Sequence, residues 1–411
     1  MTKRDNIVKK NFLYNAVGST VNASISLIFM IIVTRINGTD KAGIFTFAFS
    51  TSCLFQVIGL FAGRAYQVTE TNKNYKNKVF IYNRIISCIL MFVASVLFVV
   101  IRGYNFYKCS IIVLLIMYKM VEAFSEVLYG IIQKNDELYK VGISLFLKGI
   151  LSVASFLILD IFTKNIELSI LSIIFVNILI IIFYDFKNAE IINVLKEKIN
   201  NKFVFLIFKF GFFTFLLTIL TQYIINASKY AIDGNMSNES QTIFGIILMP
   251  ATLVILCGQF LIHPFLNKLT QLLKEKRYNE FKNIVCKLVV AIFIFGIIID
   301  IIAYLIGIPF LELIYGISLK KYKIDLIIII TGAVFFGMSY IFSNALIATR
   351  NTFIQALIFI ITSLFALVAS NLLVSKQGIY GASISYMLSM LLLLVLFIIS
   401  FLFVSKRKEG N

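Results

Sequence analysis

Ionisable side chains lie inside several long apolar segments of this 411-residue sequence, and these are the residues that could do chemistry. In the segment 109–132, Lys119, Glu122 and Glu126 fall on one face of a helix that turns by about 100° per residue. A charge inside a membrane costs several kcal/mol unless it meets a partner or a wet cavity, so this face must point into the protein. Two interpretations stay open: an ion-coupling site, or a Lys–Glu pair that neutralises itself.

Two further candidates lie in other apolar segments. Lys148 is near the middle of 139–160 with no acid within one helical turn, so we predict that it is a functional cation. Asp300 is the only acid in 285–306. We expect it to be either a proton or ion site or the partner of a cation across a cavity.

Three arginines lie near the ends of apolar segments, where long basic side chains can reach the lipid headgroups. This explanation suits Arg84 and Arg64. It is weaker for Arg35, because the charge distribution places Arg35 on the outer side of the membrane, where positive charge is disfavoured.

A short pattern recurs in the two halves of the chain. The stretch GLFAGR ends at Arg64, and the stretch GQFLIH ends at His263, so both read G-x-F-x-x-cation. A basic residue precedes each at the outer end of the previous segment, Arg35 in the first half and Lys229 in the second. This weak repeat favours a duplicated bundle. His263, the only histidine, is either a titrating switch or the capped end of a helix.

Cations outnumber acids in this buried set, which predicts an anionic substrate because guanidinium groups bind phosphate through two parallel hydrogen bonds. The predicted substrate contacts are Arg35, Arg64, Lys148, Lys229 and His263. The five cysteines occur singly, without C-x-x-C spacing, and the sequence has no GxGxxG or Walker loop. We therefore expect no metal site, no cofactor and no nucleotide hydrolysis.

The apolar segments themselves dictate the fold class. Hydrophobic residues make up 60% of the chain and charged residues 14%, and continuous runs of about 20 apolar residues recur from end to end. Continuous rather than alternating runs indicate helices, so we predict an all-α membrane protein of about twelve transmembrane helices. The predicted spans are 12–35, 42–63, 83–101, 109–132, 139–160, 166–186, 205–227, 242–263, 285–306, 324–348, 353–374 and 379–404.

The distribution of charge predicts the topology. The net charge is +18, and 25 of the 38 Lys and Arg residues fall on the side that contains both termini. The positive-inside bias therefore places both termini in the cytoplasm of a bacterial cell, and the charge does not indicate nucleic acid. The amphipathic segment 187–202 (KNAEIINVLKEKINNK) is predicted to be a cytoplasmic linker between two six-helix lobes, 1–186 and 203–411.

Several motifs resemble those of the polysaccharide flippases, the O-antigen and capsular repeat-unit translocases of the multidrug/oligosaccharidyl-lipid/polysaccharide (MOP) exporter superfamily. The resemblance extends over nearly the whole chain. It is carried by NFLYNAVG at 11–18, RING at 35–38, GLFAGRAYQV at 59–68, YGIIQ at 129–133, IFGIILMP at 243–250, GIPFLELIYG at 307–316 and ALIATR at 345–350.

The resemblance implies two pseudo-symmetric lobes around a central cationic cavity. It also implies transport of a polyprenyl-pyrophosphate-linked oligosaccharide to the outer leaflet by alternating access, with membrane lipid and polysaccharide polymerase or assembly proteins as partners. Arg35 and Arg64 match positions where the family commonly keeps a basic residue. Lys148, Lys229 and His263 are assigned here from burial and repeat symmetry alone.

Two other functions remain open. A cation-coupled drug or metabolite exporter of the same superfamily would need a buried carboxylate for a cationic drug, and the first predicted span has no acid. A membrane glycosyltransferase or polymerase would need catalytic residues in a sizeable outer loop, and the predicted outer loops are short. We therefore expect a transporter and not an enzyme.

Overall fold

Backbone N–H and C=O groups in hydrocarbon must bond within their own segment, so long apolar runs fold as helices. The computed structural model describes residues 3–61, 63–72, 75–349 and 352–409, and within these ranges the regular structure is entirely helical. The chain divides into two compact units, Met1–Ile219 and Leu220–Asn411. The prediction of an all-α fold is confirmed.

Nine helices in the described ranges are long and apolar enough to cross a membrane. Two of them are pairs of spans: α1 (Lys3–Gly59) bends at Gly38, and α15 (Thr352–Glu409) bends at Gly378. Both glycines have positive φ, 84° and 59°, which a residue with a side chain rarely adopts. One more helix, α4 (Phe106–Lys134), carries three ionisable residues within its apolar run. The described helices thus provide the twelve expected spans.

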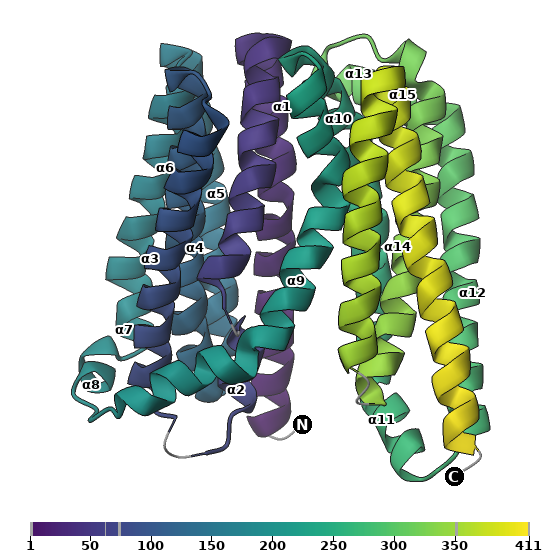
Figure 1. The fold of residues 1–411 in the computed structure, drawn as a ribbon. Helices are drawn as coiled ribbons and strands as arrows, with labels where there is room; N and C mark the ends of the chain where they lie inside the picture. Colours follow the sequence, from purple (N-terminus) through teal and green to yellow (C-terminus); the bar gives the residue numbers. More distant parts are fainter. Residues whose placement is uncertain (1–2, 62, 73–74, 350–351, 410–411) are drawn as a thin grey trace. The chain divides into compact units, whose positions relative to one another are not determined.

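The long helices of unit 1 pack side by side; the short α2 lies between α1 and α3 in the chain, and further short elements follow α6 (Figure 1). α1 packs against α4 and α5, α3 packs against α4, and α5 packs against α6. The elements after α1 are α2 (Gly63–Thr69), α3 (Asn77–Arg102), α4, α5 (Leu138–Thr163), α6 (Ile166–Ile180), a π-helical turn (Ile181–Asp185), α7 (Phe186–Asn188) and α8 (Ile191–Leu195).

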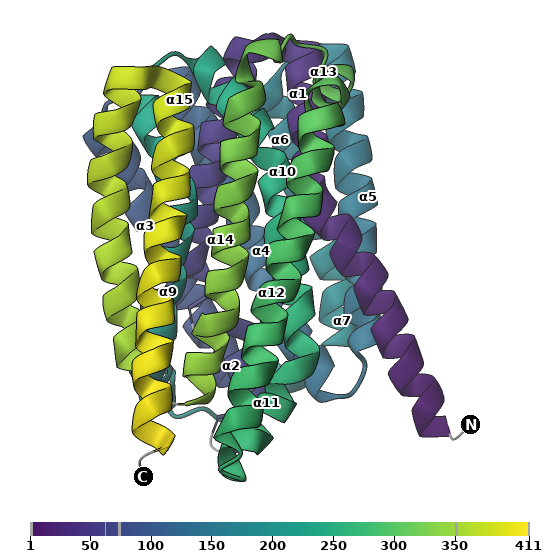
Figure 2. The ribbon, with the colours of Figure 1, turned by 90° about the vertical axis from the view of Figure 1, so that its right-hand side faces the viewer.

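In unit 2, α14 is the central helix and packs against α10, α12 and α15 (Figure 2). The helices of this unit are α10 (Asn238–Ile262), α11 (Leu266–Lys274), α12 (Tyr278–Ile302), α13 (Ile308–Tyr315), α14 (Lys323–Ala348) and α15.

The long helix α9 (Asn201–Asn235) contains the boundary between the two units, at Ile219 and Leu220. Its first half belongs to unit 1, where Phe208 and Phe215 both pack against the ring of Phe61, with ring centroids 4.9 and 4.8 Å apart. A functional division into lobes at 187–202 stays a prediction.

Two glycines of unit 1 lie at a close contact between helices. A Cβ added to Gly18 of α1 would collide with the backbone carbonyl of Gly142 in α5, and a Cβ on Gly142 would collide with the backbone of Tyr14 and Asn15. Backbone atoms cannot move aside as a flexible side chain can. Small residues thus allow α1 and α5 to approach closely, as is common between membrane helices.

We expect Gly142→Ala to lower the thermal unfolding midpoint of the detergent-purified protein, because overpacking costs about 1–3 kcal/mol. Gly234→Ala in α9 is the matched control, since a Cβ there meets nothing within 4 Å. It should leave the midpoint unchanged or raise it slightly. Equal midpoints for the two variants would contradict the close approach of α1 and α5.

Candidate functional site

A buried ion pair lies in the centre of unit 1. The Nζ of Lys148 in α5 is 2.6 Å from Oδ2 of Asp185, and it also donates to Ser125 Oγ at 2.7 Å and to Tyr129 OH at 2.9 Å. The side chains of Lys148 and Asp185 are 5% and 0% exposed. An ammonium has three N–H groups, so these three acceptors satisfy it completely.

The π-helical turn Ile181–Asp185 carries the partner carboxylate. Its other oxygen, Oδ1 of Asp185, accepts from Ser144 Oγ at 2.6 Å, and Ser144 is in turn 2.9 Å from Tyr129 OH. The pair is therefore embedded in a closed hydrogen-bond network from α4, α5 and the π turn. Lys148 has no acid within one helical turn of its own helix, and the turn after α6 brings Asp185 to it.

A second pair lies on α4. Lys119 Nζ is 2.7 Å from Oε2 of Glu122, and Gln56 Nε2 from α1 donates to the same oxygen at 3.1 Å. The ammonium also lies 4.7 Å from the centre of the Phe49 ring. The contacts of a self-neutralising pair are thus present, and ion coupling at these residues stays a prediction.

The second acid of the α4 stripe, Glu126, pairs with a guanidinium group. Arg64 Nε of α2 is 3.7 Å from Oε2 of Glu126. Nη1 of Arg84 donates to the carbonyl oxygen of Gly59, at the end of α1. Within the described part of the chain, Arg64 Nη1 and Arg84 Nε are buried and have no hydrogen-bond partner.

These groups surround one cavity of about 130 Å³. The polar residues that line it are Asn22, Gln56, Glu122, Ser125, Glu126, Tyr129, Lys148 and Asn177. At roughly 30 Å³ per water, the cavity has room for a few water molecules and is smaller than the roughly 300–1,000 Å³ of a drug-sized site. It is thus a polar cavity in unit 1, and Arg64 pairs with Glu126, one of the residues that line it.

The other predicted residues do not line this cavity. Arg35 is exposed near the bend of α1, and Lys229 is half-buried in α9. Asp300 of α12 accepts from Thr331 Oγ1 at 3.2 Å, while its Oδ1 has no partner among the described residues. His263 lies in a short 3₁₀ turn after α10, and its side chain is outside the described part of the structure. The roles of these four residues stay predictions.

Sequence reasoning missed two charged residues of this region. Asp185 shares the segment 166–186 with Glu167 and lies at its end, so the criterion of a single acid in an apolar segment, which Asp300 meets, does not reveal it. Arg84 was attributed to the headgroups because it lies near a span end. That attribution is wrong, because Arg84 is 3% exposed and bonds to the protein backbone.

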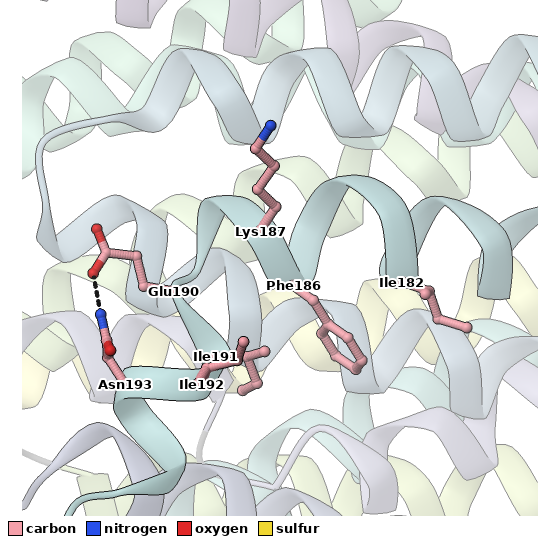
Figure 3. Close-up of a pocket in the computed structure, with 7 residues that line it drawn as sticks. All are labelled: Ile182, Phe186, Lys187, Glu190, Ile191, Ile192 and Asn193. Carbon is pink, nitrogen blue, oxygen red and sulfur yellow. Dashed lines mark hydrogen bonds between the residues drawn. The ribbon is translucent and has the colours of Figure 1, made fainter.

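A larger hollow of about 580 Å³ lies at the surface of unit 1, where α7 turns into α8 (Figure 3). Its walls are mainly Ile182, Phe186, Ile191 and Ile192, and Lys187 points away from these apolar side chains (Figure 3). Such a lining suits hydrocarbon better than a charged headgroup. We therefore take the polar cavity, and not this hollow, as the candidate functional site.

Known proteins share this chain's fold and much of its length, although no family model matches the sequence. The capsular polysaccharide biosynthesis protein CapF of Staphylococcus aureus is 26% identical over 395 residues, which are 94% of this chain and 97% of CapF. A multidrug resistance MATE family transporter of the MOP superfamily, in an inward-facing conformation, superposes with a TM-score of 0.75 at 11% identity and covers 97% of this chain and 98% of its own.

The lipid II flippase MurJ superposes with a TM-score of 0.72 at 15% identity, over 97% of this chain and 90% of its own. The predicted resemblance to the MOP superfamily is confirmed, and the chain has the fold of its multi-pass membrane transporters and flippases.

The Lys148–Asp185 contact should behave as one coupled unit. Lys148→Met or Asp185→Asn alone should destabilise the protein by about 3–5 kcal/mol, because each leaves its partner's charge buried without compensation. The double variant should lose much less than the sum of the two single losses. Thermal or denaturant unfolding of the purified protein measures this cycle, and additive losses would disprove the coupling.

Proposed function

We propose that this chain, which has the fold of the MOP transporters and flippases, translocates polyprenyl-pyrophosphate-linked oligosaccharide repeat units across the bacterial cytoplasmic membrane. The products would serve surface polysaccharide synthesis, in the capsule or O-antigen class. The similarity to CapF along almost the full length of both chains supports this cargo, as does the shared fold with a lipid II flippase. The activity is transport by alternating access and not catalysis.

The observation that carries the proposal is the guanidinium pair Arg64 and Arg84, each of which has a buried N–H group without a partner in the described residues. The Arg64–Glu126 distance is long at 3.7 Å, and Arg84 bonds to the carbonyl oxygen of Gly59. An unpaired buried donor costs about 1–3 kcal/mol. Pyrophosphate oxygens would accept hydrogen bonds from these N–H groups, and their negative charge would complement the positive charge of the two guanidinium groups.

The position of the guanidinium pair suits the loading of cargo. Arg64 follows the end of the second span. The predicted cytoplasmic position of both termini would place that end at the inner leaflet. The polar headgroup must leave water there, while the polyprenyl tail stays in hydrocarbon. We propose that Arg64 and Arg84 bind the pyrophosphate first, and that Arg35, Lys229 and His263 contact it later in transport.

Lys148 has a different proposed role. Because Asp185, Ser125 and Tyr129 occupy its three donors, it is not available for the headgroup without breaking that network. We assign it to positioning: it holds α4, α5 and the π turn around the polar cavity.

A cation-coupled exporter of drugs or metabolites is the second candidate, since several structural relatives are multidrug transporters. Such an exporter would need a carboxylate available to a cationic drug. Both carboxylates that line the cavity already contact cations, Glu122 with Lys119 and Glu126 with Arg64. This occupancy favours the anionic cargo. A glycosyltransferase or polymerase is less favoured, because the shared fold is that of transporters and flippases.

The test is translocation of a polyprenyl-pyrophosphate-linked chitobiose in proteoliposomes, detected by a lectin that reaches only one side. Arg64→Gln should lower the rate about tenfold or more, because a charge-assisted hydrogen bond contributes roughly 1.5–3 kcal/mol. Arg64→Lys should retain part of the rate. Arg84→Gln should act like Arg64→Gln in whatever fraction remains folded.

Arg102→Gln is the matched control, because Arg102 is exposed at the last residue of the same helix as Arg84. Its rate should stay within about twofold of the wild type, a change of less than roughly 0.5 kcal/mol. The unfolding midpoint of each variant is measured as well, so that a lower rate caused by weaker cargo binding is distinguished from one caused by a less stable protein. Normal translocation by well-folded Arg64→Gln would refute the role of the guanidinium pair. Efflux of a cationic dye with no glycan translocation would favour the drug exporter instead.

A further inference from the structure

Unit 2 contains an open pocket of about 390 Å³ that the proposed headgroup site does not use. It lies where α9 passes into α10, where α14 begins and where α15 bends at Gly378. Its volume falls in the range of small-molecule sites, which is roughly 300–1,000 Å³. The polar and aromatic residues that line it are Ser240, Lys321, Tyr322, Asp325, Gln377 and Tyr380.

The bend of α15 assembles this pocket. Gly378 has φ 59° and ψ −133°, a conformation that glycine alone adopts readily. Its neighbours Gln377 and Tyr380 are thereby placed in the same pocket as Tyr322 and Asp325 from the start of α14. The side chain of Met236 closes the bend on the α9 side, 3.1 Å from the position of an added Cβ on Gly378.

One carboxylate in the pocket is fixed in orientation. Asp325 is 5% exposed, and its Oδ1 accepts from Ser383 Oγ at 3.0 Å. Gln377 supplies an amide that can both donate and accept, and Ser240 supplies a hydroxyl. The pocket thus offers several hydrogen-bonding groups of different kinds within one small volume.

Two tyrosine rings accompany these polar groups. Tyr380 is 46% exposed, and Tyr322 is partly buried. Each provides a flat apolar surface with a polar hydroxyl at its edge. A sugar ring has matching features, since its C–H groups form an apolar face and its neighbouring hydroxyls both donate and accept hydrogen bonds.

The charges and polar groups of the pocket disfavour three other ligands: a phosphate, a metal ion and an acyl chain. One cation, Lys321, and one anion, Asp325, give no net charge, so neither a phosphate nor a metal ion is favoured. No cluster of three acidic, His or Cys ligands occurs among the described residues. An acyl chain would leave the polar groups unpaired, unlike in the apolar hollow beside α7.

We infer that this pocket binds a saccharide unit of the cargo, an inference that rests on the proposed flippase function. One span separates the C-terminus, which the charge distribution predicts to be cytoplasmic, from Gly378, so the same prediction places the pocket on the outer side. The glycan therefore meets it after crossing, and the pocket holds the released headgroup on the side where it is next used.

The chain contains no tryptophan, so Tyr380→Trp introduces a single fluorescent reporter inside the pocket. The purified variant is titrated with glucose, galactose, N-acetylglucosamine and glucuronic acid. At least one sugar should shift the emission saturably. Adding Gln377→Ala or Asp325→Asn should weaken that binding about tenfold, the loss of roughly one good hydrogen bond. Gln377 is exposed, so its variant tests the pocket without risk to folding.

Tyr82→Trp on α3 is the matched control, because Tyr82 is similarly exposed, at 41%, but lies in unit 1. It should not respond to any of the four sugars. No saturable shift in Tyr380→Trp, or an equal shift in Tyr82→Trp, overturns the inference. If the protein translocates glycan but the emission of Tyr380→Trp does not change with sugar, saccharide binding in this pocket is refuted and the flippase function is not. If the emission changes but no glycan is translocated, the flippase function is refuted and saccharide binding in the pocket is not.

Discussion

A charged ammonium in a low-dielectric interior requires an opposite charge, and in unit 1 the Lys148–Asp185 contact meets that requirement. The contact does more than neutralise charge. Its hydrogen bonds reach Ser125 and Tyr129 on α4 and Ser144 on α5, while the carboxylate comes from the π turn after α6. Three spans are thus joined at one point, and the walls of the polar cavity depend on it.

The three cation–carboxylate contacts around that cavity form a graded series. The N–O distances are 2.6, 2.7 and 3.7 Å for Lys148–Asp185, Lys119–Glu122 and Arg64–Glu126, and the side chains become more exposed in the same order. Tight, dry pairs hold structure because breaking them is costly. The loose, wetter pair can exchange its carboxylate for a phosphate at lower cost. The two tight pairs thus stabilise the helix packing, and the loose Arg64–Glu126 pair is the part of the region suited to binding.

Much of the fold followed from the sequence, because hydrocarbon permits few structures. Apolar run lengths predicted twelve spans, and the glycine bends at Gly38 and Gly378 fall between spans that were predicted as separate. The site was less predictable. Lys119 and Glu122 are one turn apart, so helical spacing revealed their pairing, but 37 residues separate Lys148 from Asp185 and only tertiary packing joins them. Arg84 was predicted to contact headgroups because its place near the end of a span does not reveal which other helices pack around its side chain.

The π turn that carries Asp185 also changes the phase of its helix. Asn177 faces the cavity, and Asp185 follows it by eight positions, which in an uninterrupted α-helix would rotate it about 80° away. A π turn holds one extra residue, which takes back about 100° of rotation and leaves the two side chains within roughly 20° of one face. The π turn therefore restores the angular position of Asp185 around the helix axis to that of Asn177. It lets an apolar helix run along the lipid for most of its length and still present both its asparagine and its aspartate inward.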